Sequence, residues 1–468
     1  MSNVDVLEKI NDEHIEFVDL RFTDLIGKEH HLTVPVGMID HDFFHQGKTF
    51  DGSSLKGWAD INQSDLALVP CQAAPLQIDP FYRHKTLLLR CNVVDPLSGK
   101  EYDLCPRAIA RRAEHHLRQT GIADKVLFGP EPEFFIFDDV RWNNEMGATF
   151  YHIDANEAHW NSAKHMDGGN TGHRPAIKGG YFPVPPVDSS QDIRSTIAEV
   201  LQHLGMVVET HHHEVATANQ CEVATRCNTL THKADEIQLL KYVIHNVSHQ
   251  FGKTATFMPK PLVGDNGSGM HCHQSLSLNG ENLFHGEGYA GLSETALFYI
   301  GGILHHAKAL NAMTNPSINS YRRLVPGFEA PTYLAYGYRN RSAAVRVPYI
   351  SNKQGKRIEV RFPDCMANPY LAFSAMMMAG LDGIEKRIHP GHAMEENLYE
   401  AQHGRTIPKL CSTLEEAMLA LEQDYEFLLQ GGVFPNRFID TWLSFLAEDV
   451  DKLRQAVHPL EFALYYSR

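Results

Sequence analysis

Two glutamates, Glu131 and Glu133, lie two positions apart inside a run of apolar residues. In an extended strand, side chains two positions apart point to the same face, so both carboxylates would point in one direction. Two further glutamates, Glu214 and Glu222, lie in similar segments separated by residues 218–220, which could form the turn of a hairpin. Such a hairpin would bring their two carboxylates close together.

Two more strand-like segments carry ionisable groups in the same way. His271 follows a glycine-rich loop, and Glu359 lies among alternating charged and apolar residues. Taken alone, each segment is explained equally well by a solvated polar face. If all of them share one sheet or half-barrel, however, five carboxylates meet in one cavity, at a desolvation cost that cations must offset.

Two divalent cations would supply most of this compensation. Carboxylates with one imidazole and no thiolate favour Mg²⁺ or Mn²⁺, because hard cations take oxygen ligands. Pairs of such ions are suited to phosphate chemistry. The six candidate ligands are Glu131, Glu133, Glu214, Glu222, His271 and Glu359.

Arginines are concentrated in one stretch of an otherwise acidic chain. Within residues 322–361 they are Arg322, Arg323, Arg339, Arg341, Arg346, Arg357 and Arg361. Guanidinium groups bind carboxylate and phosphate oxygens in a forked geometry, and phosphoryl transfer depends on positioning and charge neutralisation. Surface salt bridges would explain any one of them equally well. The glycine-rich loop at 264–269 could approach a ligand closely, although many turns look alike.

Composition excludes several functional classes. A formal net charge of -15 argues against nonspecific nucleic-acid binding, and the eight cysteines form no C-x-x-C pair, which fits reduced thiols better than disulfides or a zinc site. The N-terminus has no signal-peptide pattern. The longest apolar run, Leu371–Leu381, is too short to span a membrane and predicts a core helix. A cytoplasmic protein is therefore expected.

The elements that must position these residues suggest an α+β chain of two parts. Residues 1–104 show short alternating strands and predict a small β-rich domain, whereas residues 105–468 predict a larger catalytic domain that opens with a helix at Pro106. Further helices are predicted around 191–205, 232–251 and 292–312, and the C-terminus is predicted to be mainly helical. The charged strands lie between these helices.

These same segments closely resemble type I glutamine synthetases, in order and spacing, over nearly the whole chain. The matching stretches are FDGSSLKGW at 50–58, FGPEPEFF at 128–135, HHHEVATANQCEVATR at 211–226, GDNGSGMHCHQS at 264–275, NPSINSYRRLVPGFEAP at 315–331, RNRSAAVRVP at 339–348 and KRIEVRFPD at 356–364. The resemblance implies a β-grasp-like N-terminal domain and a catalytic domain whose antiparallel strands form a half-barrel, or funnel, flanked by helices. It also implies the ligation of ammonia to L-glutamate with ATP, through a γ-glutamyl phosphate.

Motif matches imply roles for individual residues. One metal would be held by Glu133, Glu214 and Glu222, and the other by Glu131, His271 and Glu359. The implied ATP contacts are Glu209, His273, Gln274, Ser275, Arg341, Arg346, Gln354 and Arg357. The implied glutamate contacts are Asn266, Gly267, Arg323, Glu329 and Arg361. Asp51 would take a proton from ammonium, Glu329 would shield the intermediate, and Arg341 would steady the phosphoryl group.

The family forms two stacked six-membered rings with shared active sites, so a dodecamer is implied, with Asp51 contributed by an adjacent subunit. Tyr399 resembles the tyrosine that an adenylyltransferase modifies in the regulated bacterial subclass. After this tyrosine the sequence differs from the regulated subclass, because Glu400, Ala401 and Gln402 replace the more usual Asp-Leu-Pro. Gln354 stands where a basic residue is common, and Lys353 or Lys356 could substitute for it.

Three other functions remain open at this level. A related ligase could couple glutamate to a polyamine, although Asp51 favours ammonium. A catalytically silent assembly or regulatory protein could keep the fold, although unused buried acids would only destabilise it. A two-metal phosphohydrolase would need water in place of glutamate, which the arginines and Asn266 disfavour.

Overall fold

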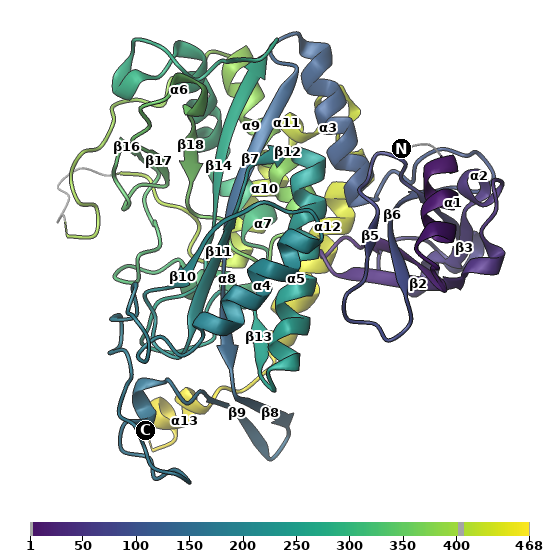
Figure 1. The fold of residues 1–468 in the computed structure, drawn as a ribbon. Helices are drawn as coiled ribbons and strands as arrows, with labels where there is room; N and C mark the ends of the chain where they lie inside the picture. Colours follow the sequence, from purple (N-terminus) through teal and green to yellow (C-terminus); the bar gives the residue numbers. More distant parts are fainter. Residues whose placement is uncertain (1–2, 401–406, 468) are drawn as a thin grey trace.

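The computed structural model describes residues 3–400 and 407–467. Ala401 and Gln402, where the sequence departs from the regulated subclass, lie outside these residues. A small N-terminal domain is attached to one side of a larger catalytic domain (Figure 1). The predicted α+β class is confirmed. No helix in the described ranges is long and apolar enough to cross a membrane.

The N-terminal domain is a mixed sheet with strand order β2-β1-β6-β4-β3, and β5 pairs with β6. Its strands are β1 (Phe17–Thr23), β2 (Glu29–Pro35), β3 (Lys48–Asp51), β4 (Asp65–Pro70), β5 (Gln77–Ile78) and β6 (Thr86–Val94). The sheet is preceded by helix α1 (Asn3–Asp12), which the sequence analysis missed, and β2 is followed by the short helix α2 (Phe43–Gln46). Val6 and Ile10, one helical turn apart, bury the inner face of α1.

The catalytic domain is built on a ten-stranded sheet with order β10-β11-β7-β14-β18-β17-β16. These strands are β7 (Lys125–Phe137), β10 (Val208–His213), β11 (Gln220–Thr225), β14 (Met270–Leu278), β16 (Tyr336–Tyr338), β17 (Val345–Val347) and β18 (Ile358–Val360). The short strands β12 (Asn228–Thr229) and β13 (Thr254–Thr256) pair with β7, and β15 (Glu281–Asn282) pairs with β14. The pairings are antiparallel except β16 with β17. A separate hairpin joins β8 (Asp139–Glu145) to β9 (Ala148–Asp154).

Helices cover one face of this sheet. They are α3 (Pro106–Thr120), α4 (Gln191–His203), α5 (Leu230–Gln250), α6 (Glu294–His305), α7 (Ala307–Thr314), α8 (Ile318–Arg323), α9 (Pro369–Glu385), α10 (Leu414–Gln423), α11 (Glu426–Leu429) and α12 (Asn436–Arg454). The last helix, α13 (Pro459–Tyr465), has no buried residue and lies away from the sheet (Figure 1). Helices α3 and α5 contact β7, and Phe373 of α9 stacks on Phe128 of β7 with ring centres 4.6 Å apart. The predicted core helix is α9, which is buried from Pro369 to Gly383.

The predicted helices are confirmed with one difference. Helix α3 begins at Pro106 and ends before Gly121, whose φ of 70° is readily adopted only by glycine. The segment predicted as one helix at 292–312 is two helices, α6 and α7, separated at His306. The ring of His306 lies 3.0 Å from Asp382 and 2.8 Å from Asp424, so its position is fixed by residues far away in the chain.

Residues of β7 divide cleanly between the two faces of the sheet. Phe128, Phe134 and Ile136, at even positions, are buried in the core with the helices. Glu131 and Glu133, at odd positions, point to the opposite face. The alternation therefore places both carboxylates on the face that the helices leave free.

Candidate active site

A cavity of about 950 Å³ opens on this free face. Carboxylate and histidine side chains from β7, β10, β11 and β14 form much of its wall. The charged or aromatic residues elsewhere in its wall include Lys178, Tyr181, Glu329, Arg341, Arg346 and Arg361. The cavity thus combines clustered acids with arginines.

Strand register brings the predicted acids together. The facing pairs are His212 with Glu222, Glu222 with Glu133, Glu131 with His271, His273 with Glu359, and Glu359 with Arg346. Five adjacent pairs of strands contribute, so the charged groups form a continuous row across the sheet. The register explains how segments more than two hundred residues apart contribute to one site.

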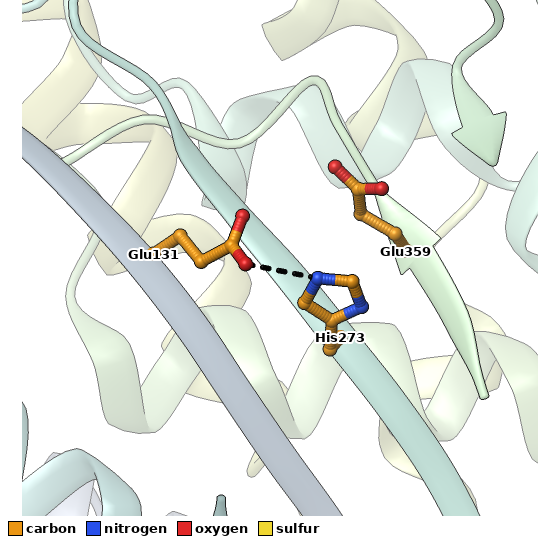
Figure 2. Close-up of side chains that lie close together, drawn as sticks. All are labelled: Glu131, His273 and Glu359. Atoms are coloured by element: carbon orange, nitrogen blue, oxygen red, sulfur yellow. Dashed lines mark hydrogen bonds and ion pairs between the residues drawn. The ribbon is translucent and has the colours of Figure 1, made fainter. Parts of the chain in front are cut away.

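One group of possible metal ligands comprises Glu131, His273 and Glu359, each with a ligand atom within 4.8 Å of the others (Figure 2). His273 Nε2 lies 3.0 Å from Glu131 Oε1. His271, the predicted ligand, is close to the same acids, with Nδ1 3.9 Å from Glu131 and 3.7 Å from Glu359. Two histidines therefore compete for one pair of carboxylates.

The other group comprises His212, Glu214 and Glu222, again with ligand atoms within 4.8 Å. His212 lies 3.4 Å from an oxygen of each glutamate. Glu133, predicted for this group, is directed toward the 264–269 loop, where the backbone N–H of Gly269 donates to its Oε2 at 2.7 Å. His212 is a residue that the sequence analysis missed. The two-residue spacing from Glu214 was the signal that could have identified it.

Burial and mutual repulsion dominate the electrostatics around β10 and β11. Burial raises the pKa of Glu133 to about 7. Burial, followed by the nearby charges of Glu133 and Glu222, raises the pKa of Glu214 to about 9. Burial and three neighbouring glutamates also raise the pKa of Glu222 well above its usual value. The chain places too few positively charged groups beside these acids to balance their negative charge, as expected for a site that binds cations.

Glu359 has the opposite environment. Burial alone would raise its pKa, but the charges of Arg361 and Arg346 hold it well below the usual value. Arg346 forms an ion pair with Glu359, and Arg361 Nε donates to its Oε1 at 3.2 Å. Burial followed by the charge of Arg361 lowers the pKa of His271 well below its ordinary value, which favours the neutral imidazole.

Only some of the predicted nucleotide contacts lie close to one another in the structure. Arg357 Nε donates to His273 Nδ1 at 3.2 Å, which places both residues on the same side of β14. Gln274 faces the helices instead: its side-chain oxygen accepts a bond from Tyr299 at 2.7 Å, and its nitrogen contacts Met376. Ser275 lies on the same strand face as His273, because strand side chains alternate.

Two other predicted nucleotide contacts, Glu209 and Gln354, lie at exposed positions. Glu209 on β10 is 3.8 Å from Arg226, and Gln354 lies in a single helical turn at 353–355. Neither is part of the cavity wall described above.

The predicted glutamate contacts have different surroundings. Arg361 Nη1 is buried without a hydrogen-bond partner among the described residues, and so is Asn266 Oδ1. Arg323, by contrast, donates to the backbone carbonyls of residues 361, 362 and 363. At Gly267 a Cβ would lie 2.4 Å from the Pro259 carbonyl oxygen, so only glycine fits there.

Of the three predicted catalytic residues, Glu329 and Arg341 line the cavity. Glu329 has a φ of 59°, an unfavourable backbone conformation for a glutamate. Asp51 is exposed in the N-terminal domain, where it accepts bonds from the Ser53 N–H at 2.9 Å and the Ser54 hydroxyl at 2.8 Å. Within the described part of this chain, Asp51 lies outside the cavity wall.

Tyr399 lies beside this arginine-rich side of the cavity. Its hydroxyl donates to the backbone carbonyl of Arg341 at 3.2 Å. Burial raises its pKa. The candidate modification residue therefore contacts the backbone of a candidate catalytic residue.

Comparison with protein families follows the same division of the chain. The model of the glutamine synthetase catalytic domain matches residues 103–465, and the model of the glutamine synthetase β-grasp domain matches residues 14–96. The chain belongs to the glutamine synthetase family. The predicted family and the predicted fold class are therefore confirmed, whereas the predicted domain limits of 1–104 and 105–468 stay a prediction.

Similar proteins span the full length of the chain. The glutamine synthetases of Methylococcus capsulatus and Escherichia coli K12 are each 58% identical over 469 positions and cover 100% of both chains. A solved Plasmodium falciparum glutamine synthetase superposes with a TM-score of 0.91 at 30% identity, covering 100% of this chain and 99% of that one. A structure of GmaS without ligand gives 0.83 at 27% identity, covering 99% and 100%.

Proposed function

We propose that the chain is a glutamate-ammonia ligase that joins ammonia to the side-chain carboxylate of L-glutamate, with hydrolysis of ATP to ADP and phosphate. One observation carries the proposal: acids and arginines from segments far apart in the chain meet in a single cavity. The chain is also 58% identical over its whole length to a glutamine synthetase. The glutamate carboxylate attacks the γ-phosphate of ATP, and ammonia then displaces phosphate from the acyl phosphate.

The proposed metal ligands fit two Mg²⁺ or Mn²⁺ ions. Glu133, Glu214 and Glu222 would hold one ion, with His212 close enough to assist, and Glu131, His271 and Glu359 would hold the other. Bound ions would neutralise phosphate charge and polarise the γ-phosphoryl group. The raised pKa values of the first group support this assignment, because cations would replace the protons that the metal-free acids retain.

His271 is the better ligand of the two competing histidines. Because Arg357 donates to Nδ1 of His273, the neutral ring of His273 carries its proton on Nε2 and donates to Glu131. A metal ligand needs a free lone pair, which His271 retains in its neutral form. His273 would then orient Glu131 and face the nucleotide, together with Arg357.

The remaining nucleotide contacts are proposed from their positions. Arg341 and Arg346, in the cavity wall, would neutralise phosphate charge. Ser275, Glu209 and Gln354 would contact the nucleoside end. Gln274 would contribute through its backbone only, since its side chain is bonded in the core.

The glutamate site is proposed around Arg361 and the loop at 264–269. The buried Nη1 of Arg361 is an unused donor that could bind a carboxylate, and the unused Oδ1 of Asn266 could accept a hydrogen bond from an amino group. Gly267 would let the backbone approach the substrate. Arg323 would support this loop rather than bind directly, because its guanidinium donates to three carbonyls.

We propose that Asp51 and Glu329 handle protons in the second step. Hydrogen bonds from the Ser53 hydroxyl and other donors lower the pKa of exposed Asp51, so it stays anionic and could attract ammonium. Because Asp51 lies outside its own chain's cavity, it would act in a neighbouring subunit of a dodecamer. Inactive Asp51→Ala and Glu359→Ala chains should then regain activity when they assemble together; mixed assemblies that stay inactive would count against shared sites.

We also propose adenylylation of Tyr399 and a cytoplasmic location, where ATP and glutamate are supplied by metabolism. Glu400 is exposed, whereas Tyr399 beside it is half-buried and its hydroxyl donates to the Arg341 carbonyl, so an adenylyltransferase would have to break this hydrogen bond. Incubation with ATP and such an enzyme should add one AMP to the intact mass, and a Tyr399→Phe chain should gain none.

The activity is tested by measuring ADP and glutamine with Mg²⁺ or Mn²⁺ while glutamate or ammonium is omitted. Glutamine should form only with all components present. Glu131→Gln should abolish its formation, and Glu422→Gln, at an exposed position on α10, should not. Equal ADP release without glutamate would favour a phosphohydrolase, and faster ligation with a polyamine than with ammonium would redirect the substrate assignment.

A further inference from the structure

Residues 325–329 form the loop that carries Glu329 to the edge of the cavity, and this loop has unusual contacts. The ring of Phe328 has two ammonium groups close to it, Lys178 Nζ at 4.2 Å and Lys260 Nζ at 3.9 Å from its centre. Lys178 Nζ also donates to the backbone carbonyl of Gly327 at 2.7 Å. Ammonium groups are attracted to the faces of aromatic rings, so both contacts hold the loop.

The two lysines come from segments that are distant in the chain. Lys178 precedes Tyr181 in the cavity wall, and Lys260 follows β13. The backbone of Lys260 is fixed to the start of α8, because its N–H donates to Asn319 Oδ1 at 2.7 Å and its carbonyl accepts from Asn319 Nδ2 at 3.0 Å. Phe328 therefore connects the Lys178 segment of the cavity wall to the Lys260 segment, which is fixed to α8.

Asp265 joins the same segments beneath the loop. Its buried carboxylate accepts from the backbone N–H groups of Lys178 at 3.1 Å, Asn266 at 2.9 Å and Thr217 at 2.8 Å. Lys260 Nζ donates to its backbone carbonyl. Charge-assisted bonds of this kind are stronger than neutral ones. Asp265 thus anchors the segment carrying Lys178 to the loop that carries Asn266.

Backbone strain is present at both ends of this connection. Lys178 has a φ of 56° and Glu329 has a φ of 59°. Residues other than glycine rarely adopt this backbone conformation unless surrounding contacts impose it. Burial lowers the pKa of Lys260 to about 8; the charge of Asp265 opposes this shift and the charge of Lys178 adds to it.

We infer that Lys178 and Lys260, anchored by Asp265, bind the ring of Phe328 and thereby hold the Glu329 loop closed over the reacting groups. These are positioning residues: they act through the loop and not on the substrate. The inference rests on the proposed function, in which the loop shields an acyl phosphate. When the loop opens, water attacks the acyl carbon, the bond to the phosphate oxygen breaks, and glutamate, phosphate and a proton are released without glutamine.

The test is the ratio of ADP released to glutamine formed in the complete assembled protein. Lys178→Met and Phe328→Leu should raise this ratio about threefold or more, as expected from losing a cation–π contact or a hydrogen bond. Lys178→Arg and Phe328→Tyr keep the cation and the ring, so their ratio should stay near one. Lys164→Met, in the same long segment but paired with Asp154, is the matched control.

Hydrogen exchange at residues 325–329 provides an independent measurement, and it should quicken in Lys178→Met and Phe328→Leu but not in the conservative variants. A ratio of one in both folded variants, or a change confined to KM, would overturn the inference while leaving the ligase activity intact. A wild-type protein that makes no glutamine would instead refute the proposed function. If Phe328→Leu fails to assemble, Lys178→Met alone decides the outcome.

Discussion

The two ends of the cavity differ in where their positive charge comes from. At the β10–β11 end, Glu133, Glu214 and Glu222 face one another, and their pKa values are raised. At the β14–β18 end, Glu359 is paired with Arg346 and Arg361, and its pKa is held low. At one end the guanidinium groups of Arg346 and Arg361 already offset part of the negative charge before the proposed ion binds, whereas the other end depends mainly on its proposed ion.

The largest expected effect follows from removing an acid at the cation-dependent end. Glu222→Gln should lower glutamine formation at least about a hundredfold, because it removes a proposed metal ligand and half of a facing acid pair. Glutamine formation and Mn²⁺ binding should be measured together, with Glu422→Gln as an exposed control. Full activity with unchanged Mn²⁺ affinity would show that this end does not hold the metal.

Stability should respond in the opposite sense at the two ends. Without metal, Glu359→Gln should lower the free energy of unfolding by about 3–5 kcal/mol, because Arg346 and Arg361 lose their buried partner. Glu222→Gln should leave that free energy unchanged or raise it, since it removes a repelled acid. Urea unfolding of both variants in a chelator checks this. Equal destabilisation would erase the distinction between the ends.

Raising the pH should also distinguish the two ends. Glu214 titrates near 9 when folded and near 4.5 in its ordinary state, so the folded protein binds more protons between these values. The stability that protonated Glu214 contributes is therefore fully present below about pH 4.5 and is lost as the pH rises toward 9.

Thermal unfolding in a chelator should thus shift to lower temperature from pH 7 to pH 9. Mn²⁺ should weaken or reverse this trend, because the cation takes the place of the protons. A metal-free protein whose unfolding temperature rises across this range would contradict the raised pKa values. Glu359, with its low pKa, adds nothing in this window.

A smaller effect is expected at His212, the imidazole of the cation-dependent end. His212→Gln should weaken Mn²⁺ binding by about tenfold, as expected for a residue that supports ligating carboxylates. Isothermal titration should measure it, with the exposed His249→Gln as control. Unchanged affinity would restrict the site to its three glutamates.

Local spacing was enough to predict the strands that carry the acids. Glu131 and Glu133 were expected to share a face of β7 because strand side chains alternate. Residues 218–220 were expected to allow a hairpin, and β10 does pair with β11, although Gln220 is already the first residue of β11. The β-grasp domain and catalytic half-barrel were expected from long motifs, and both are confirmed. Helix α1 was missed because its short amphipathic pattern was taken for part of a strand-rich region.

The sequence by itself determined which groups are ionisable, which of them share a strand face, and the family to which the chain belongs. Only the tertiary structure decided that His212 lies beside Glu214 and Glu222, and that Arg357 sets the tautomer of His273. It also decided that the side chain of Gln274 points into the core, and that the guanidinium of Arg323 donates to backbone carbonyls. The reason is physical. Side-chain direction along a strand is fixed by local geometry, whereas partners are fixed by strand register and by the burial that distant segments impose.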